Sequence, residues 1–379
     1  MTGPIYLDYN GTTPHGPEVI EAMRPFLETD FGNPSSSHWY GRGPKEALMT
    51  ARAQVAGILG CTTAEVLFTS GGTESNNHAL KSIAGARHFK GVHLITSSIE
   101  HPAILEVCRF MEGHGSDITI LPVDKDGLVS PSDVEAAIRP DTTMISIMHA
   151  NNEVGTIQPI AEIAALARRN RILMHTDAAQ SMGKIPTRVD DLGVDLLSVA
   201  GHKIYGPKGV GALYIRDGVE TGIFCHGAGQ ENGRRAGTEN VLEIVGLGRA
   251  CETAETEMQQ HANRMQEMRD RLEKGLTATL TAVRLNGHRK LRLPNTCSVS
   301  FRDLEANRLL EEIEPDVAAS AGAACHADYV EISHVLKAMQ VPEQWARGTV
   351  RFSTGRFTTA EEIDRALEVI VAAVKRLRG

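Results

Sequence analysis

The sequence lacks several features that would place it in other classes of protein. No stretch reaches the roughly 18 apolar residues that a membrane helix needs. The first residues lack a basic segment followed by an apolar one, so we expect no signal peptide. The net charge of -8 offers no basic face for a nucleic acid. We therefore expect a soluble cytoplasmic protein that binds neither membranes nor nucleic acids.

Cysteine is sparse, and its spacing excludes a zinc ribbon or a dense disulfide framework. The chain has 6 cysteines, and none forms a C-x-x-C pair. The scattered cysteines and histidines have no ligand spacing either, so we expect no bound metal and no metal-dependent lyase. Free cysteine is among the most buried residue types. We expect that role for Cys61, Cys108, Cys225, Cys251 and Cys297.

Short apolar runs alternate with amphipathic stretches over the first two thirds of the chain. At 379 residues the chain exceeds one ordinary core, so two domains are expected. The alternation predicts an α/β protein with a seven-stranded, mainly parallel sheet that is covered by helices on both faces. The expected strands are Val66–Ser70, His93–Ile99, Ile118–Val123, Met144–His149, Ile172–His175, Leu196–Val199 and Val210–Ile215.

The pattern changes after Gly237. A long, charged helical stretch runs from about Asn240 to Leu280 and leads into a shorter region that ends in the expected helix Ala360–Leu377. We interpret residues 14–255 as a large cofactor-binding domain. Residues 1–13 and 256–379 form a smaller α+β domain in this interpretation, with the long helix as the connector.

Lys203 lies in a glycine-rich turn directly after the apolar run Leu196–Ala200. Burial beside such a strand would desolvate the amine and depress its pKa, which makes it a usable nucleophile and base. A lysine in a glycine-rich turn is more often a solvated surface charge. Three companion segments favour the functional interpretation.

These companions also follow apolar runs, so they converge on the carboxyl edge of the predicted sheet. Ser70–Asn77 places two glycines ahead of a helix, an arrangement suited to a phosphate. Asp177 ends a buried strand and needs a partner there, either a metal or a protonated pyridine nitrogen. Glu100-His101 and Asn151–Glu153 complete the set. Such convergence favours a binding site over a set of polar side chains that only hydrogen-bond within the core.

With these residues in view, the chain closely resembles the cysteine desulfurases of the NifS/IscS type. These are class V aminotransferase-like enzymes of fold-type I, which use pyridoxal 5'-phosphate (PLP). The resemblance covers essentially the whole chain in order. Its motifs are Asp8–Pro14, Gly32–Ser36, Ser70–Asn77, Glu100-His101, Asn151–Glu153, Asp177–Gln180, Gly201–Gly209, Gly229–Glu231, Gly237–Asn240, Arg292–Asn295 and Arg351–Arg356.

The resemblance implies how the ring of PLP is held. Lys203 would bind the cofactor covalently and later carry the Cα proton of the substrate. Asp177 would pair with the pyridine nitrogen, and Gln180 would bond the ring hydroxyl. His101 would stack on the ring face and assist proton transfer.

The resemblance also implies ligands for the cofactor phosphate and for the substrate. The phosphate ligands would be Gly72, Thr73, His202 and, from a second subunit of a homodimer, Thr238. Asn152 and Arg356 would bind the substrate carboxylate, a task that suits a planar guanidinium. Members of the family often have a serine where this chain has Ala200, so another donor would have to compensate there.

Cys325 lies among small residues in a segment that resembles the catalytic-cysteine loop of the family. Its thiolate would attack the sulfur of L-cysteine and keep it as a persulfide while L-alanine leaves, and a depressed pKa would help. His326 beside it could lower that pKa or could face solvent. A sulfur-acceptor protein would then take the sulfur for iron–sulfur assembly or tRNA thiolation.

Two other functions stay open on the sequence alone. The run Gly322–Asp328 looks more like selenocysteine lyases, whereas Gln230–Gly233 fits desulfurases. We favour desulfurase activity on cysteine, with selenocysteine lyase as the alternative. A non-catalytic PLP-binding scaffold is the other possibility, and the intact set of Lys203, Asp177 and Cys325 argues against it.

Overall fold

A seven-stranded sheet forms the centre of the larger part of the molecule. The computed structural model describes residues 3–85, 89–326 and 329–379, with the backbone alone for 323–326 and 329–331. The strands are β2 (Val66–Thr69), β3 (His93–Ser97), β4 (Asp117–Leu121), β5 (Thr142–Ser146), β6 (Leu173–Asp177), β7 (Leu196–Ala200) and β8 (Gly211–Ile215). Their order is β2-β8-β7-β6-β5-β3-β4, and β8 alone runs antiparallel to both of its neighbours. The expected seven-stranded, mainly parallel sheet is confirmed.

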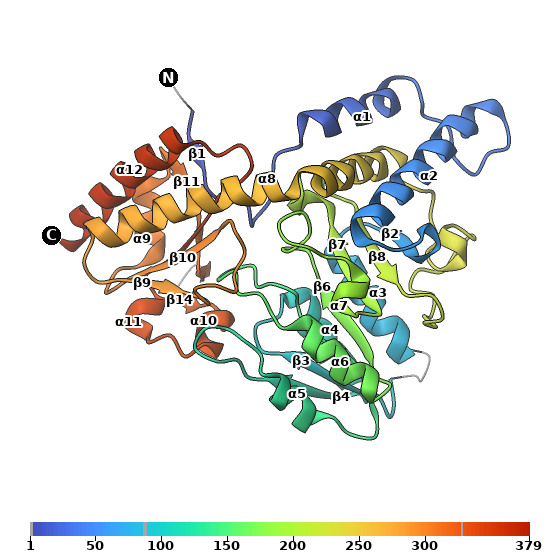
Figure 1. Cartoon of the computed structure of the whole chain (residues 1–379), viewed down its shortest axis with the longest axis horizontal. Helices are drawn as coiled ribbons and strands as arrows, with labels where there is room; N and C mark the ends of the chain where they lie inside the picture. The colour runs from blue at the N-terminus through green and yellow to red at the C-terminus, as the bar shows by residue number, and fades with distance from the viewer. Residues whose placement is uncertain (1–2, 86–88, 327–328) are drawn as a thin grey trace.

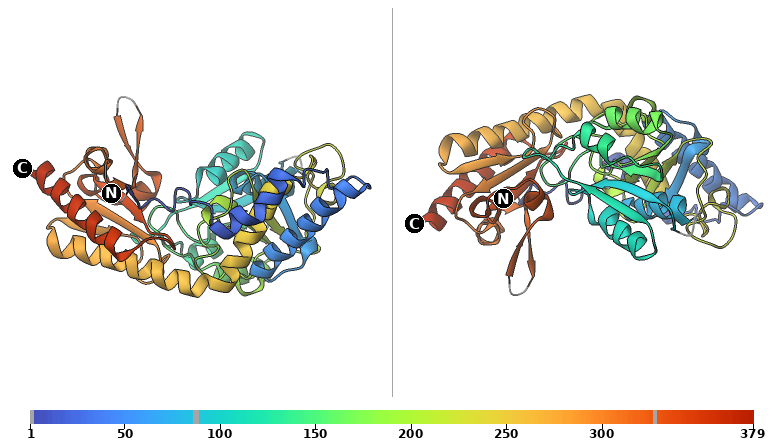
Figure 2. Two further views of the ribbon diagram at one scale, coloured as in Figure 1. Left: turned by 90° about the horizontal axis from the view of Figure 1, so that it is seen from above. Right: turned by 90° about the horizontal axis from the view of Figure 1, so that it is seen from below.

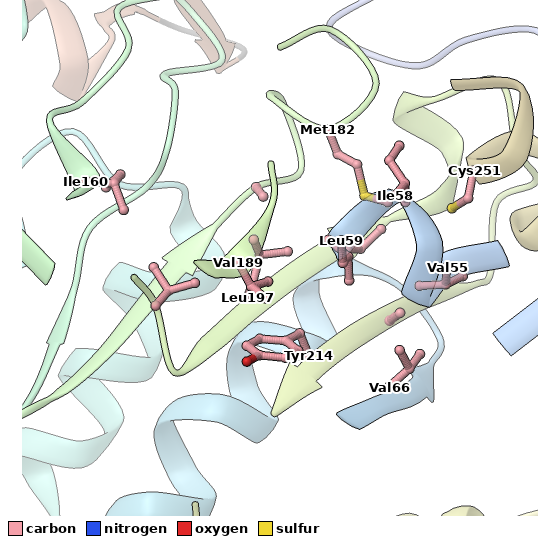
Figure 3. Close-up of a cluster of buried hydrophobic side chains, with 14 of the residues drawn as sticks. Val55, Ile58, Leu59, Val66, Ile160, Met182, Val189, Leu197, Tyr214 and Cys251 are labelled. Carbon is pink, nitrogen blue, oxygen red and sulfur yellow. The ribbon is translucent and has the colours of Figure 1, made fainter. Parts of the chain in front are cut away.

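Helices cover both faces of this sheet (Figure 1). They are α1 (Pro17–Glu28), α2 (Trp39–Leu59), α3 (Gly72–Gly85), α4 (Pro102–Gly113), α5 (Pro131–Ala137), α6 (Ile160–Arg169) and α7 (Val189–Leu192). On one face, Leu197 packs with Leu59 of α2, as in the cluster that Figure 3 shows. The adjacent Leu196 belongs to a core on the other face, with Leu80 of α3 and Ile104 of α4. Burial on both faces explains why these strands are almost continuously apolar.

A four-stranded antiparallel sheet forms the centre of the smaller part. It consists of β9 (Val283–Asn286), β10 (Thr296–Phe301), β12 (Ser320–Ala321) and β15 (Thr349–Ser353), in the order β12-β15-β10-β9. The helices α9 (Ala306–Ile313) and α12 (Ala360–Arg378) pack here. The N-terminal strand β1 (Ile5–Tyr6) joins this part by pairing with β11 (Val317–Ala318).

One long helix connects the two parts. In α8 (Val241–Thr279), Leu247 and Cys251 pack into the core of the large sheet. Leu272 and Leu276 of the same helix pack into the core of the small sheet. Figure 1 shows the helix running across both parts. No helix within the described residues is long and apolar enough to cross a membrane.

A hairpin lies between β12 and β15 in the chain and extends away from the body of the molecule (Figure 2). It consists of β13 (Ala323–His326) and β14 (Tyr329–Ile332), which pair with each other as a separate two-stranded sheet. The short helices α10 (His334–Ala338) and α11 (Glu343–Ala346) come next. The remaining short elements are the 3-10 turns η1 (Thr63–Glu65), η2 (Gly201–Lys203) and η3 (Glu231–Gly233).

Candidate active site

Most of the polar residues predicted for the site line one cavity of about 260 Å³. The strands β6 and β7 end at this cavity, as expected for a ligand site in an α/β sheet. The structure brings together Gly72, Thr73, His101, Asn152, Asp177, Gln180, His202 and Lys203. Thr238, Arg356 and the described part of the cysteine loop do not line it.

The Lys203 amine is held by two backbone carbonyl groups. Its Nζ donates to Asn10 O at 2.6 Å and to Gly11 O at 2.7 Å. The turn η2 follows β7 at once, so the fully buried strand fixes where the side chain begins. Burial, helped by the nearby charge of Arg351, lowers the pKa of Lys203 to about 8. The amine is therefore much easier to deprotonate than an ordinary lysine.

The carboxylate of Asp177 has a fixed orientation at the end of β6. Its Oδ2 accepts a hydrogen bond from Asn76 Nδ2 at 2.7 Å, and its Oδ1 accepts one from the Ala179 N–H at 2.9 Å. The side chain is buried except where it meets the cavity. Asn76 belongs to the glycine-turn motif but was not singled out from the sequence. A signal in the sequence could have identified it: Asn76 lies one turn into a helix that begins at the predicted anion site.

The glycine turn forms another wall of the cavity. Gly71 has a φ of 147°, in the region that favours glycine, and Gly72 begins helix α3. A Cβ at Gly72 would lie 3.3 Å from the Cβ of Ala200, so a side chain would crowd the space between the turn and β7. The free N–H groups at the start of a 14-residue helix lie beside this space.

Two histidines of the cavity are neutral at physiological pH. Burial lowers the pKa of His202 to about 4, helped by the charge of Lys203, and its Nδ1 lies 3.1 Å from Thr12 Oγ1. Burial also lowers the pKa of His101. His101 caps α4 by accepting the Ala103 N–H at its Nδ1 at 3.1 Å. Its proton therefore resides on Nε2, which leaves an N–H donor at the other edge of the ring.

Arg351 lines the cavity, and the sequence analysis did not assign it. It lies on β15, and its guanidinium donates to Asn152 O at 3.0 Å and to Asp8 Oδ1 at 2.7 Å. Its Nε is buried and has no hydrogen-bond partner among the described residues. A buried guanidinium with an unused donor beside a cavity is suited to a carboxylate.

Arg356 does not reach the cavity, which corrects its assignment to the substrate carboxylate. Its Nη2 donates to Glu18 Oε1 of α1 at 2.6 Å. Its guanidinium stacks 4.3 Å from the centre of the Tyr205 ring and 4.7 Å from that of Phe357. The charge is thus already paired and covered by aromatic rings. Arg351, five positions earlier in the same motif, occupies the place that Arg356 was expected to fill.

Two other predicted residues lie outside the cavity. Thr238 is exposed and lines a separate cavity of about 220 Å³ together with Ser70 and Arg235. Cys325 lies on β13, and its side chain is outside the described part of the structure. Neither assignment is tested by the geometry of a single subunit.

The remaining cysteines divide into two groups. Cys108, Cys251 and Cys297 are buried, as expected. Cys225 is exposed and Cys61 is half-buried, so the expectation of burial was wrong for Cys225. Among the described residues, no group of three or more histidine, cysteine or acidic side chains could hold a metal ion.

Comparison with known proteins identifies the family. The sequence pattern of the class-V aminotransferases matches residues 5–366. A cysteine desulfurase IscS from Dictyoglomus turgidum is 49% identical over 379 residues, which span 100% of this chain and 96% of that relative. The human cysteine desulfurase is 44% identical over 378 residues, spanning 99% of this chain and 82% of the relative. The chain belongs to the class-V aminotransferases and, within them, to the cysteine desulfurases.

Solved structures agree with this assignment. A NifS-like protein superposes with a TM-score of 0.93 at 37% identity, covering 99% of this chain and 100% of the other. A structure described as SspA in complex with cysteine gives a TM-score of 0.82 at 39% identity, covering 94% and 100%. Family membership confirms the fold-type I architecture and the expected dependence on PLP.

The residues of the cavity fit PLP. The start of α3 and the turn at Gly71 offer backbone N–H groups to a phosphate, and a side chain at Gly72 would fill part of the space. Asp177 offers a fixed carboxylate to a protonated ring nitrogen. Lys203 offers an amine of lowered pKa to the aldehyde. Each chemical group of the cofactor therefore has a counterpart in this wall.

Proposed function

We propose that this protein is a PLP-dependent cysteine desulfurase that converts L-cysteine to L-alanine and transfers the sulfur to Cys325 as a persulfide. One observation carries the proposal. A lysine of lowered pKa, a fixed carboxylate and an arginine with an unused donor line the same cavity. The first two suit the cofactor, and the third suits an amino-acid substrate.

When bound, PLP supplies an electron sink that stabilises negative charge at the substrate Cα. Asp177 keeps a proton on the pyridine nitrogen and so maintains that sink. Lys203 would hold the aldehyde of the cofactor and would act as the base towards the Cα proton, a role that its lowered pKa suits. His101 lines the cavity and offers an N–H to the bound ring or substrate.

Arg351, in place of Arg356, binds the substrate carboxylate. Its contact with Asn152 O places both residues at one end of the cavity, which keeps Asn152 in the substrate site. The ion pair with Asp8 fixes the orientation of the guanidinium before any substrate arrives. Such preorganisation lowers the entropic cost of binding.

Cys325 receives the sulfur. Its thiolate attacks the sulfur of the substrate, and an S–S bond forms as the Cβ–S bond of the substrate breaks. The electron pair of the broken bond and a proton go to Cβ, and the amino acid leaves as L-alanine. The position of Cys325 on a hairpin that extends from the body supports onward transfer to a sulfur-acceptor protein (Figure 2).

The quaternary and domain organisation follows from the same assignments. Thr238 is exposed and does not line the cavity of its own subunit, which supports a homodimer in which it reaches the phosphate of the partner. The large domain comprises residues 14–255, and the small domain comprises 1–13 and 256–379. Helix α8 supports this division, because Ala254 packs in the first core and Met268 in the second. We place the enzyme in the cytoplasm.

The activity can be tested on the purified protein. It should be yellow, should release L-alanine from L-cysteine, and should carry a persulfide that is detected by mass spectrometry on the peptide that contains Cys325. The same assay with L-selenocysteine measures the alternative activity. A protein that takes up PLP but releases no alanine from either amino acid would contradict the proposal. Sedimentation that finds an active PLP-loaded monomer would contradict the homodimer.

A further inference from the structure

A second buried lysine lies behind the cavity, and no step above uses it. Lys184 is 5% exposed and follows β6 by a tight turn in which Gly183 has a φ of 72°. Its Nζ donates to the backbone O of Gln180 at 2.9 Å and to the side-chain Oε1 of Gln180 at 3.4 Å. Both acceptors are neutral, and none of the ion pairs among the described residues includes Lys184. A buried ammonium without a carboxylate partner is costly.

Lys184 is also close to the cofactor lysine. The two side chains line a small cavity of about 10 Å³ together with Tyr205 and His261. Burial, together with the charges of Lys203 and Arg351, lowers the pKa of Lys184 to about 7. Electrostatic repulsion acts on both partners, so a charge on Lys184 also disfavours a proton on Lys203.

The contact with Gln180 has a directional consequence. An ammonium can only donate hydrogen bonds, so the atom of the Gln180 amide that faces it must be the oxygen. The amide nitrogen then points the other way, and it donates to Asn10 O at 3.0 Å at the wall of the main cavity. An apolar side chain in place of Lys184 would leave the bond to Asn10 O as the one hydrogen bond that orients this amide among the described residues.

We infer that Lys184 is a positioning residue of the cofactor site: it holds the Gln180 amide with its N–H₂ end towards the cavity and, when protonated, places positive charge behind Lys203. The inference rests on the proposed function and on the role expected for Gln180 as the partner of the ring hydroxyl of PLP. Its location explains why a lysine without a counter-ion persists in the interior. The positive charge of Lys184, which is costly to bury, acts on Gln180 and Lys203, the two residues that hold the cofactor ring.

The test uses the holoenzyme and the variant Lys184→Met, whose unbranched side chain is one atom shorter and lacks both the charge and the donor. The dissociation constant for PLP should rise about tenfold, as expected when a hydrogen bond from a charged group is lost. The pH at which the visible band of the bound cofactor shifts should rise by about one unit, since removal of a positive charge favours the protonated form. Lys274→Met, on the exposed side of α8, is the matched control.

A double-mutant cycle separates positioning from simple structural support. If Lys184 acts through Gln180, Gln180→Ala should weaken PLP binding much less in the Lys184→Met background than in the wild type. Additive losses would overturn the inference, as would an unchanged pH midpoint in Lys184→Met.

A third variant covers the case in which Lys184→Met does not fold. Lys184→Gln retains an N–H donor without the charge, so it should bind PLP nearly as well as the wild type and still shift the pH midpoint upwards. An unshifted midpoint in this variant would also overturn the inference. A wild-type protein that takes up no PLP at all would contradict the proposed function instead.

Discussion

The cofactor cavity and the hairpin that carries Cys325 are built in opposite ways. Residues of the cavity lie at the ends of strands that pair on both sides within the seven-stranded sheet, and Asp177 and Lys203 are each held by two hydrogen bonds. The strands β13 and β14 pair with each other as a sheet of their own. The fold thus fixes the geometry of one region and leaves the other on a projecting element.

The root of the hairpin, however, is tied to the wall of the cavity. Ser333 donates its N–H to Gly322 O at 3.1 Å and its hydroxyl to Glu153 Oε2 at 2.5 Å. His334 Nε2 lies 2.9 Å from Glu100 O. Glu153 and Glu100 are the chain neighbours of Asn152 and His101, which line the cavity. In the proposed function, the proton chemistry would therefore lie in the cavity, and sulfur acceptance would lie on an element that is anchored beside it.

The largest effect is expected from Lys203→Ala in the rigid region. The variant should lose the visible band of the bound cofactor and nearly all release of alanine, because no other described amine has the same access to the cavity. Its unfolding temperature should change little, since the lysine bonds only to backbone carbonyl groups there. Absorbance, alanine release and thermal unfolding measure the three quantities. A variant with near-normal turnover would remove Lys203 from the mechanism.

Cys325→Ala changes the hairpin and should separate sulfur acceptance from the proton chemistry of the cavity. The variant should bind PLP as the wild type does and respond to cysteine with a change in the visible spectrum, because the described residues that line the cavity lie outside the hairpin. It should release no alanine from cysteine and carry no persulfide. Selenocysteine could still turn over slowly, since the C–Se bond is weaker and selenolate is the better leaving group.

Two outcomes would contradict this separation. Full desulfurase activity would mean that another cysteine accepts the sulfur, and the exposed Cys225 would be the first to examine by the further change Cys225→Ala. Loss of PLP binding would mean that Cys325 has a structural role and that the two regions are not independent.

A pair of arginine variants tests which of the two arginines belongs to the cavity. Arg351→Gln should raise the KM for cysteine by about a hundredfold, the loss expected for a charge-assisted carboxylate contact. Arg356→Gln should leave KM within about threefold and instead lower the free energy of unfolding by roughly 1–3 kcal/mol, because Glu18 loses its partner in a partly buried ion pair. Steady-state kinetics and urea unfolding distinguish the two results. The reverse pattern would restore Arg356 as the substrate ligand.

The two arginines also show which features of the site could not be predicted from the sequence. The strand cores were predictable, since buried strands are near-continuous apolar runs, and all seven were located within a few residues. Polar residues that directly follow such strands, such as Asp177 and Lys203, were predictable for the same reason. The choice between Arg351 and Arg356 depends on Glu18, 338 positions away in the chain, and on the pairing of β15 with β10. No local pattern contains that information.

The smallest effect on activity is expected at Glu100, where the two regions meet and where a substitution should act on stability. Burial raises the pKa of Glu100 from 4.5 to about 8, while the hydrogen bonds from Ser97 and the Met148 N–H oppose the shift. The folded protein therefore keeps a proton at this site that the unfolded chain releases above pH 4.5. Because the folded state binds more protons in that window, the free energy of unfolding falls as pH rises from about 4.5 to about 8.

Glu100→Gln mimics the protonated form at every pH and should remove this contribution. The difference in unfolding free energy between variant and wild type should be near zero below pH 4.5 and should grow in favour of the variant by on the order of 1 kcal/mol per pH unit up to about pH 8. The exposed Glu368→Gln controls for loss of a carboxylate and should give a flat difference. A flat difference for Glu100→Gln as well would mean that Glu100 is ionised in the folded protein. The carbonyl of Glu100 would then hold the hairpin root beside a buried negative charge, and His334 would be the residue placed to balance it.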